Sequence, residues 1–188
     1  MIPKRVKQFY VNVTDKMTEK DYDYANEILN KKELELFMKL SKSEQKHSIR
    51  IAKDIEFIID NNETDDEEIL KNRNLLMKSA LLHDIGKITK RLNVIDKSII
   101  VILNKLTKGK LKSIKKSKKI QCYYNHSSYG YEILKDIIDD TVILDIVKNH
   151  HSDNGNNLVN FFKQIDDKNS IFIYYEVILK SKVNLYKY

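Results

Sequence analysis

Residues 80–87 have the sequence Ala-Leu-Leu-His-Asp-Ile-Gly-Lys, which places an imidazole directly beside a carboxylate after an apolar run. The residues before this pair show helical spacing, and one helix is expected over residues 68–84. The side chains expected to pack inward from that helix are Leu75, Leu76, Ser79, Ala80 and Leu82. Gly86 is expected to stop the helix, because glycine commonly occupies the position just past a helix end. The segment therefore predicts a buried helix with His83 and Asp84 at its C-terminal end.

Residues that break helices are scarce along the whole chain. Its 188 residues include four glycines and a single proline, Pro3, while 41% of the residues are hydrophobic. Sandwiches and barrels need many tight turns, so this composition favours helices around one sizeable core. The sequence therefore predicts an all-α fold, with a helical bundle over residues 41–188 and a short N-terminal helical extension over residues 1–40.

Capping patterns predict where two of the helices begin. Ser41 and Glu44 form a capping-box pattern that opens a helix ending near Ile59. One face of that helix carries His47, Ile51, Asp54, Ile55 and Ile58. Thr18 and Asp21 form a weaker N-cap pattern within the extension. The apolar stripe expected in the extension consists of Leu34, Phe37 and Met38.

Further helices are expected over residues 95–106, 129–138, 142–151, 158–168 and 171–182. The last segment is also strand-like by propensity, but a single strand would have no partner. Cys122 is the one cysteine, so no internal disulfide forms, and the residue is expected to pack as a small hydrophobe. Residues 1–9 lack the apolar centre of a cleavable signal. The apolar run 99–103 is far shorter than the roughly 20 residues that span a bilayer, so a cytoplasmic protein without a membrane partner is expected.

Lysines dominate one segment and the net charge. The chain carries a net charge of +7, and eight of the fifteen residues from Lys105 to Lys119 are lysine. Such a run is commonly a solvated loop or helix face. It also fits a basic surface that binds nucleic acid or an acidic protein, or that gathers anionic substrates ahead of His126.

The residues that carry chemistry are the histidines. The chain has five of them, in the order His47, His83, His126, His150 and His151. A single histidine on an apolar face is more commonly a core residue than a ligand, so the argument depends on the ordered set together with Asp84 and a later aspartate. Imidazole with carboxylate suits first-row metals, and a carboxylate can bridge two ions that clamp a phosphoryl group.

This ordered set resembles the HD superfamily, in particular its branch with a His-Asp-Ile-Gly motif. His126 begins His-Ser-Ser-Tyr-Gly-Tyr-Glu-Ile-Leu, which is similar to a segment of the branch that cleaves cyclic dinucleotides, and the pair at 150–151 resembles that branch's double histidine. That branch continues with Gly-Tyr-Pro, whereas residues 152–157 are Ser-Asp-Asn-Gly-Asn-Asn. The resemblance therefore implies a phosphohydrolase acting on a nucleotide or another small phosphorylated metabolite, with cyclic dinucleotides disfavoured.

The resemblance also implies a ligand set for two divalent ions. The expected ligands of one ion are His47, His83 and Asp166, those of the other are His126, His150 and His151, and Asp84 bridges the two. Iron or manganese is expected first, with zinc, magnesium, nickel or cobalt as alternatives. Asp167 is the alternative to Asp166, which is preferred because Phe162 and Ile165 precede it at core-facing positions.

Two further polar residues have both a functional and a plain interpretation. Lys87 follows Asp84 by three residues, so it is either a catalytic contact to a substrate phosphate or a surface lysine. Asp54 either orients a ligand imidazole or is a surface carboxylate. Two other functions stay open: an HD-type di-iron oxygenase, which the histidine-rich second group suits, and a basic HD-fold protein that binds nucleic acid.

Overall fold

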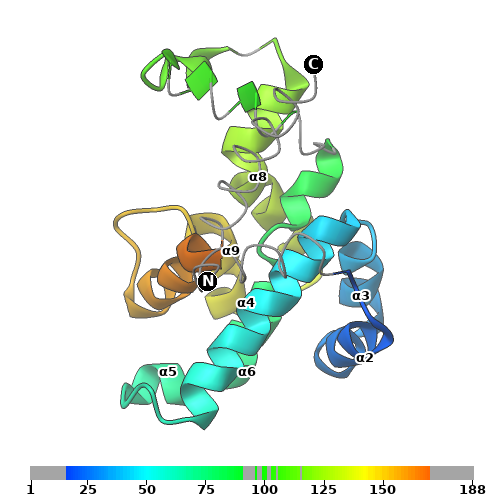
Figure 1. Ribbon diagram of the computed structural model, residues 1–188, viewed down its shortest axis with the longest axis vertical. Coiled ribbons are helices and arrows are strands. Elements are labelled where there is room, and N and C mark those ends of the chain that lie inside the picture. Colours follow the sequence, from blue (N-terminus) through cyan, green and yellow to red (C-terminus); the bar gives the residue numbers. More distant parts are fainter. Residues whose placement is uncertain are drawn as a thin grey trace, which may run out of the picture.

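The computed structural model describes residues 16–90, 96, 99–100, 103–104, 106–114 and 116–169, and these contain helices and no strand (Figure 1). In chain order the helices are α2 (Glu19–Ile28), α3 (Lys31–Phe37), α4 (Lys42–Asp60), α5 (Glu67–Lys71), α6 (Arg73–Leu82), α8 (Lys118–Leu134) and α9 (Thr141–Asn149). Two 3-10 helices, η1 (Ile85–Thr89) and η2 (Lys110–Ser113), lie between α6 and α8, and residues 157–169 are again helical. The predicted all-α fold is confirmed.

Both predicted helix starts have the geometry of a capping box. The Ser41 hydroxyl accepts from the Glu44 backbone N–H, and the Glu44 carboxylate accepts from the Ser41 N–H at 3.0 Å. Thr18 and Asp21 form the same reciprocal pair at α2. Each box satisfies donors that the helix itself leaves unpaired, which fixes where the helix begins.

The core forms where α4 packs along α6, and Figure 1 shows the two helices crossing through the middle of the molecule. Ile51 and Ile55 of α4 are fully buried, as their spacing predicts. Phe37 belongs to the same core, whereas Met38 is 45% exposed, so the predicted stripe of the extension is only partly buried. The division of the chain at residue 40 stays a prediction.

The helix predicted over 68–84 differs from the structure in two ways. Asn72 separates α5 from α6, and α6 ends at Leu82, so His83 and Asp84 lie in the turn that follows it. Gly86 does not end a helix as predicted, because it lies inside η1. A Cβ at Gly86 would lie 1.8 Å from the backbone oxygen of His126, so glycine is needed here for close packing of η1 against α8.

The other expected helices are found with shifted ends. Helix α8 begins at Lys118 rather than at residue 129, which places His126 in the middle of a helix. The helix expected over 142–151 ends at Asn149, and the one expected over 158–168 covers 157–169. The helix expected over 171–182 lies outside the described residues, and so does half of the one expected over 95–106, whose described residues are helical.

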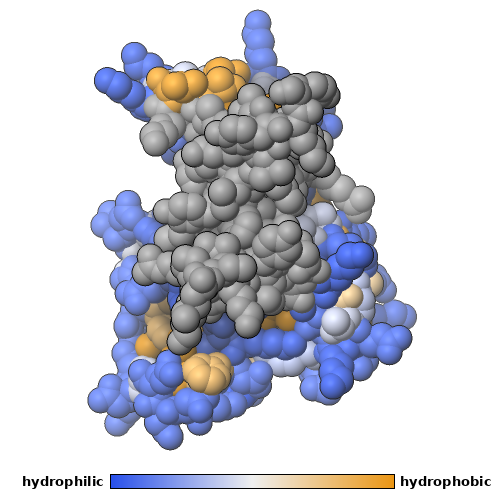
Figure 2. Space-filling view, in the orientation of Figure 1, coloured by the Kyte–Doolittle hydropathy of each residue, from blue (hydrophilic) through white to orange (hydrophobic). Residues whose placement is uncertain are grey.

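A small second cluster lies at the N-terminal end of α8, where Ile100 and Leu111 pack against Ile120 and two tyrosines. Apolar side chains are also exposed in this part of the chain, Leu106 most of all at 74%, and Figure 2 shows apolar surface at this end of the molecule. Across the described residues, none of the helices has both the length and the apolar character needed to cross a bilayer.

Candidate metal centre

Five segments of the chain bring seven candidate metal-binding side chains into one cluster. Helix α4 supplies His47, the turn after α6 supplies His83 and Asp84, and the middle of α8 supplies His126. The remaining three come from the residues after α9 and from the helical stretch 157–169: His150, His151 and Asp166. All of them are buried except His151. Burial of so many ionisable groups is costly unless they are paired or hold a metal.

Asp84 lies between two sets of ligands. Its Oδ2 is 3.4 Å from the Nε2 of His83, and its Oδ1 is 3.4 Å from the Nε2 of His126. On the His83 side, the Nε2 of His47 lies 3.1 Å from Asp166 Oδ1, and His83 Nε2 lies 4.0 Å from the same oxygen. One carboxylate therefore presents a different oxygen to each set.

On the other side three imidazoles converge. The Nε2 atoms of His126 and His151 are 3.0 Å apart, and the ring centroids of His150 and His151 are 4.0 Å apart. Ligand atoms of these three residues all lie within 4.8 Å of one another, and so do those of His83, His150 and Asp166. His150 is therefore within reach of both sets, whereas the family resemblance assigns it to the second ion alone.

Three of the histidines are oriented by their own helices. The Nδ1 atoms of His83, His126 and His150 each lie 2.9 Å from the carbonyl oxygen three residues earlier. A carbonyl only accepts, so each Nδ1 carries the proton and donates it. The Nε2 lone pair of each ring is thus left to face the cluster, which is how metal-binding histidines are commonly held.

Several buried atoms in the cluster lack a hydrogen bond. Asp84 Oδ1, His150 Nε2 and His47 Nδ1 are buried polar atoms with no hydrogen-bond partner among the described residues. Leaving such an atom unsatisfied costs about 1–3 kcal/mol. The first two are a carboxylate oxygen and an imidazole nitrogen that face the cluster, and a divalent cation would satisfy both, so the residues fit a metal.

Burial and charge put these groups in the protonation states that a metal requires. Burial lowers the pKa of His126 to about 3 and lowers the pKa of His47, His150 and His151 from their usual value. Burial alone would raise the pKa of Asp84, but its interactions with His83 and with the ammonium of Lys87 outweigh burial and hold that pKa well below its usual range. Neutral imidazoles and ionised carboxylates are ready to bind a cation without releasing protons.

Lys87 lies at the edge of the cluster, where the turn of η1 directs its ammonium to Asp84 Oδ2. Burial alone would lower the pKa of Lys87, but the charge of Asp84 outweighs it and raises the pKa, so Lys87 stays a cation. Its side chain is 19% exposed. Lys87 therefore lies between the buried carboxylate and solvent.

Two aspartates are placed away from the ligand cluster. Asp167 is exposed, whereas its neighbour Asp166 is buried against His47, so Asp166 is the one that joins the cluster. Asp54 does not orient an imidazole as one interpretation supposed. Its Oδ2 accepts from the Asn169 amide at 3.0 Å, a contact between α4 and the last helical stretch that the sequence offered no way to anticipate.

Two glycines, Gly86 and Gly130, allow η1 to pack closely against α8, although the sequence analysis expected Gly86 to stop a helix and gave Gly130 no role. The added Cβ at Gly86 would also lie 2.6 Å from the backbone nitrogen of Gly130. A Cβ at Gly130 would lie 3.0 Å from the Val147 side chain of α9. Where η1 packs on α8, Asp84 Oδ1 lies 3.4 Å from His126 Nε2. The signal was present, because Gly130 follows His126 by four residues and glycine is rare in this chain.

Comparison with known proteins supports the interpretation of the cluster. A family model described as HD domain matches residues 45–170, which cover all seven side chains. Comparison with curated proteins and with solved structures gave no match. HD domains bind divalent metals and are generally metal-dependent hydrolases. The match extends over more than half of the chain, and the protein therefore belongs to the HD domain family.

Proposed function

We propose that this protein is a phosphohydrolase with a dinuclear metal centre, which cleaves a phosphate ester of a nucleotide or another small phosphorylated metabolite. The observation that carries the proposal is the position of Asp84, whose two oxygens face two separate sets of ligands at 3.4 Å each. A single carboxylate in that position fits a bridge between two ions, and the two-ion arrangement is typical of enzymes that cleave phosphate esters.

The candidate ligands fall into two sets, one for each ion. One ion would be held by His47, His83 and Asp166 and the other by His126, His150 and His151, with Asp84 shared between them. Iron or manganese suits this mixture of imidazole and carboxylate best, and zinc, magnesium, nickel or cobalt are alternatives. Two such ions supply Lewis acidity, which polarises a phosphoryl group and acidifies water.

Substrate access follows from exposure. His151 and Lys87 are the most exposed members of the site, so we expect the phosphate to approach the cluster where these two residues meet solvent. Lys87 keeps its charge and turns its ammonium toward Asp84, where it would attract a phosphate oxygen as a point charge. We assign Lys87 this role in binding the substrate and Asp84 the role of holding the ions.

Metal content tests the proposal directly. The wild type and Asp84→Ala are purified without chelator and analysed by elemental analysis, with Asp167→Ala as the control for loss of an exposed carboxylate. About two ions per chain in the wild type and in Asp167→Ala, largely lost in Asp84→Ala, are expected. Release of phosphate or nucleoside phosphate from a panel of esters should follow the metal content. A wild type that stays empty after reconstitution with iron, manganese and zinc contradicts the proposal.

A di-iron oxygenase is the second candidate, because one ligand set consists of three imidazoles, which suits iron. Such an enzyme would consume oxygen with a polyol or phosphonate substrate and would need a redox-active ion. Oxygen uptake by the iron-loaded protein favours this candidate. Ester cleavage with zinc or magnesium, which are redox-inert, rules it out.

A further inference from the structure

One end of the molecule carries a group of exposed apolar side chains. Of the seven large apolar side chains that the described residues expose, four lie close together in the sequence: Ile99, Leu103, Leu106 and Ile114. We call these four residues the apolar patch. Figure 1 draws this part in green beyond the N-terminal end of α8, and Figure 2 shows apolar side chains there with hydrophilic ones on either side. Exposed aliphatic side chains that gather in one place commonly mark a binding surface.

Helical spacing explains why three members of the apolar patch face outward together. The described residues between 96 and 106 are helical. Ile99, Leu103 and Leu106 stand at positions i, i+4 and i+7, which fall on one face of a helix. Leu106 is 74% exposed and Ile99 is 50% exposed. The three side chains therefore form one apolar stripe that faces solvent.

A neighbouring face of the same segment is fixed to α8. Ile100 and Leu111 are buried and pack against Ile120 in the second cluster. Asn104 accepts a hydrogen bond from the Tyr124 hydroxyl at 2.5 Å. Other side chains thus attach the segment to the protein, and the apolar patch is not needed for that attachment. Its exposure is not explained by the packing of the fold.

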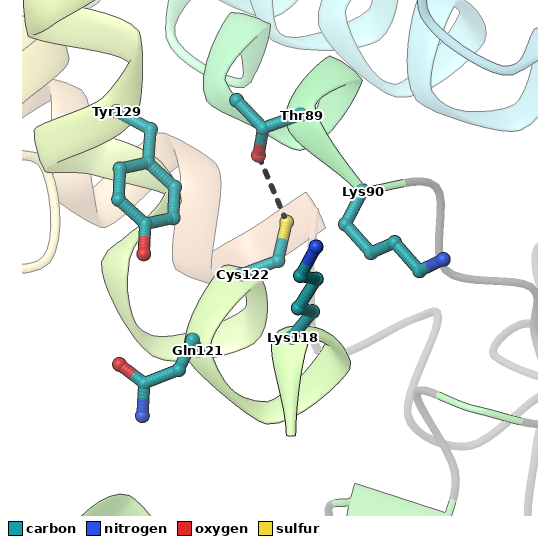
Figure 3. A pocket seen from close by; sticks show the side chains of 6 residues that line it. All are labelled: Thr89, Lys90, Lys118, Gln121, Cys122 and Tyr129. Carbon is teal, nitrogen blue, oxygen red and sulfur yellow. Dashed lines mark hydrogen bonds between the residues drawn. The ribbon is translucent and has the colours of Figure 1, made fainter. Parts of the chain in front are cut away.

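The same segment is strongly basic. Residues 97–119 contain nine lysines and neither aspartate nor glutamate. The described lysines among them are all exposed: Lys108, Lys110, Lys112, Lys116, Lys118 and Lys119. Lys119 forms an ion pair with Asp96 at 2.6 Å, and Figure 3 shows Lys118 lying along a pocket toward Cys122. The other four form no ion pair with a described residue, so their positive charge is not compensated.

Aliphatic side chains beside unpaired lysines fit the surface of an anionic lipid bilayer. At such a surface, Leu and Ile side chains enter the boundary between headgroups and acyl chains, while the ammonium groups of lysines stay with the headgroup phosphates. Nucleic acid fits less well. Residues 97–119 contain no Phe, Tyr or Trp on which bases could stack, and phosphate contacts would leave the apolar patch in water.

We propose that this end of the molecule docks on an anionic membrane surface, with the apolar patch entering the outer part of the bilayer and the four unpaired lysines contacting lipid phosphates. Such docking needs no segment that crosses the bilayer, because the helix lies along the surface. The proposal differs from the sequence-based expectation of a protein without a membrane partner. It is independent of the reaction at the metal centre.

Sedimentation with lipid vesicles tests the proposal on the full chain as purified. Vesicles of phosphatidylcholine alone are compared with vesicles that also contain roughly 30% phosphatidylserine, and the wild type should bind the anionic ones at least about tenfold more tightly. Lys110→Ala/Lys112→Ala should weaken that binding roughly 20-fold, because each lysine at such a surface contributes about a factor of five. Lys31→Ala/Lys32→Ala removes two exposed lysines of α3 and should bind as the wild type does.

A second pair of variants tests the apolar contribution. Leu103→Ser/Leu106→Ser should weaken binding to the anionic vesicles by about tenfold or more, and this loss should persist at high salt, which screens charges only. Phe57→Ser/Leu70→Ser, which changes two exposed apolar residues elsewhere, should bind as the wild type does. All of these side chains are exposed, so each variant should unfold at the wild-type Tm.

Several results would overturn the membrane assignment. Equal binding to neutral and anionic vesicles, or no binding to either, contradicts it, and so does an equal loss in a control variant. Single-stranded RNA is the competing probe. Salt-sensitive RNA binding that is lost in the lysine variant and kept in the leucine variant, without binding to vesicles, would assign this surface to nucleic acid instead.

Discussion

Asp21 and Asp84 are both 1% exposed, yet the two carboxylates differ in how many hydrogen-bond partners they have. Asp21 accepts from Lys46 and Lys53 at 2.7 Å each and from the backbone and hydroxyl of Thr18. Asp84 has an oxygen, Oδ1, that finds no hydrogen-bond partner in the described part of the chain. A buried carboxylate whose bonding capacity is filled by the protein has a structural role, whereas one left unfilled among imidazoles leaves room for a cation.

The largest expected effect is stabilisation by metal. A bound ion would supply the partner that Asp84 Oδ1 lacks among the described residues, whereas the oxygens of Asp21 already have hydrogen-bond donors. Manganese or iron at a thousand times its dissociation constant should stabilise the folded protein by about 4 kcal/mol. That corresponds to a rise of roughly 10 °C in Tm for a chain of this size. Thermal unfolding with and without chelator measures the effect. A shift of the same size in Asp84→Ala would show that the ions bind elsewhere.

Removal of the charge at Asp21 should be the next largest effect. Asp21→Asn removes the carboxylate that pairs with the buried Lys46, and we expect the free energy of unfolding to fall by roughly 2–3 kcal/mol, less than for a fully enclosed pair because Lys53 is half-exposed. Urea unfolding measures it, with the exposed Asp23→Asn as the matched control. Metal content should stay at the wild-type level in both variants. Loss of metal in Asp21→Asn would mean that the two regions are coupled.

Acid should affect the metal-free histidine cluster before it affects Asp21. Burial lowers the pKa of His126 and His150 below the usual 6.5, so these rings stay neutral in the folded protein while they take up protons in the unfolded chain. Stability therefore falls as the pH drops from 7 to 5, by about 2 kcal/mol for each buried imidazole at pH 5. Unfolding of metal-free protein across that range measures the slope, and His126→Gln should reduce it.

The carboxylate of Asp21 also loses its contribution to stability on acidification, but in a lower pH window. Burial would raise its pKa, but Lys46 and Lys53 outweigh burial and hold the pKa below the usual 3.8. Its contribution is therefore complete above about pH 4 and is lost as the pH falls further. Asp21→Asn should thus show the wild-type slope between pH 7 and 5. An unfolding free energy that is flat over that range would contradict the neutral state of the imidazoles.

The smallest effect is expected at Asp167, the exposed neighbour of a ligand. Asp167→Asn should change the free energy of unfolding by less than about 0.5 kcal/mol and should leave metal content unchanged. Asp166→Asn, one residue away, should lower metal content clearly, because Asp166 is buried against His47. Elemental analysis of the two variants side by side makes the comparison. Equal loss of metal in both variants would show that Asp166 is not the specific late ligand.

The order of the histidines and the capping residues were enough to predict the helical fold and to single out the residues of the cluster. These signals are local or follow chain order, so a single sequence carries them. The start of α8 was missed because Lys118 and Lys119 end a lysine run that resembles a solvated loop, although lysine is a good helix former. The helix starts eleven residues before the predicted position, so His126 was not recognised as part of one.

Features that depend on contacts between distant segments were beyond the sequence. Gly86 fits equally well as a helix stop or as a point of close approach, and only the packing of η1 on α8 decides between them. Asp54 lies on the same helix face as His47, but that face is wide enough for it to bond Asn169 instead. His150 lies close to both ligand sets because of how α9 packs, and this packing cannot be predicted from the spacing of residues along the chain.

The three histidines that donate to carbonyls of their own helices have a consequence for the choice of metal. Each ring loses its rotational freedom when the protein folds, so that entropic cost does not weaken ion binding. With the rings preorganised, the distance between the two ligand sets follows from the helices alone, above all from the approach of Gly86 to α8. Selectivity between ions of different radius is then a property of the backbone, and a methyl group added at Gly86 would alter it by displacing the backbone of His126 while every ligand side chain is kept.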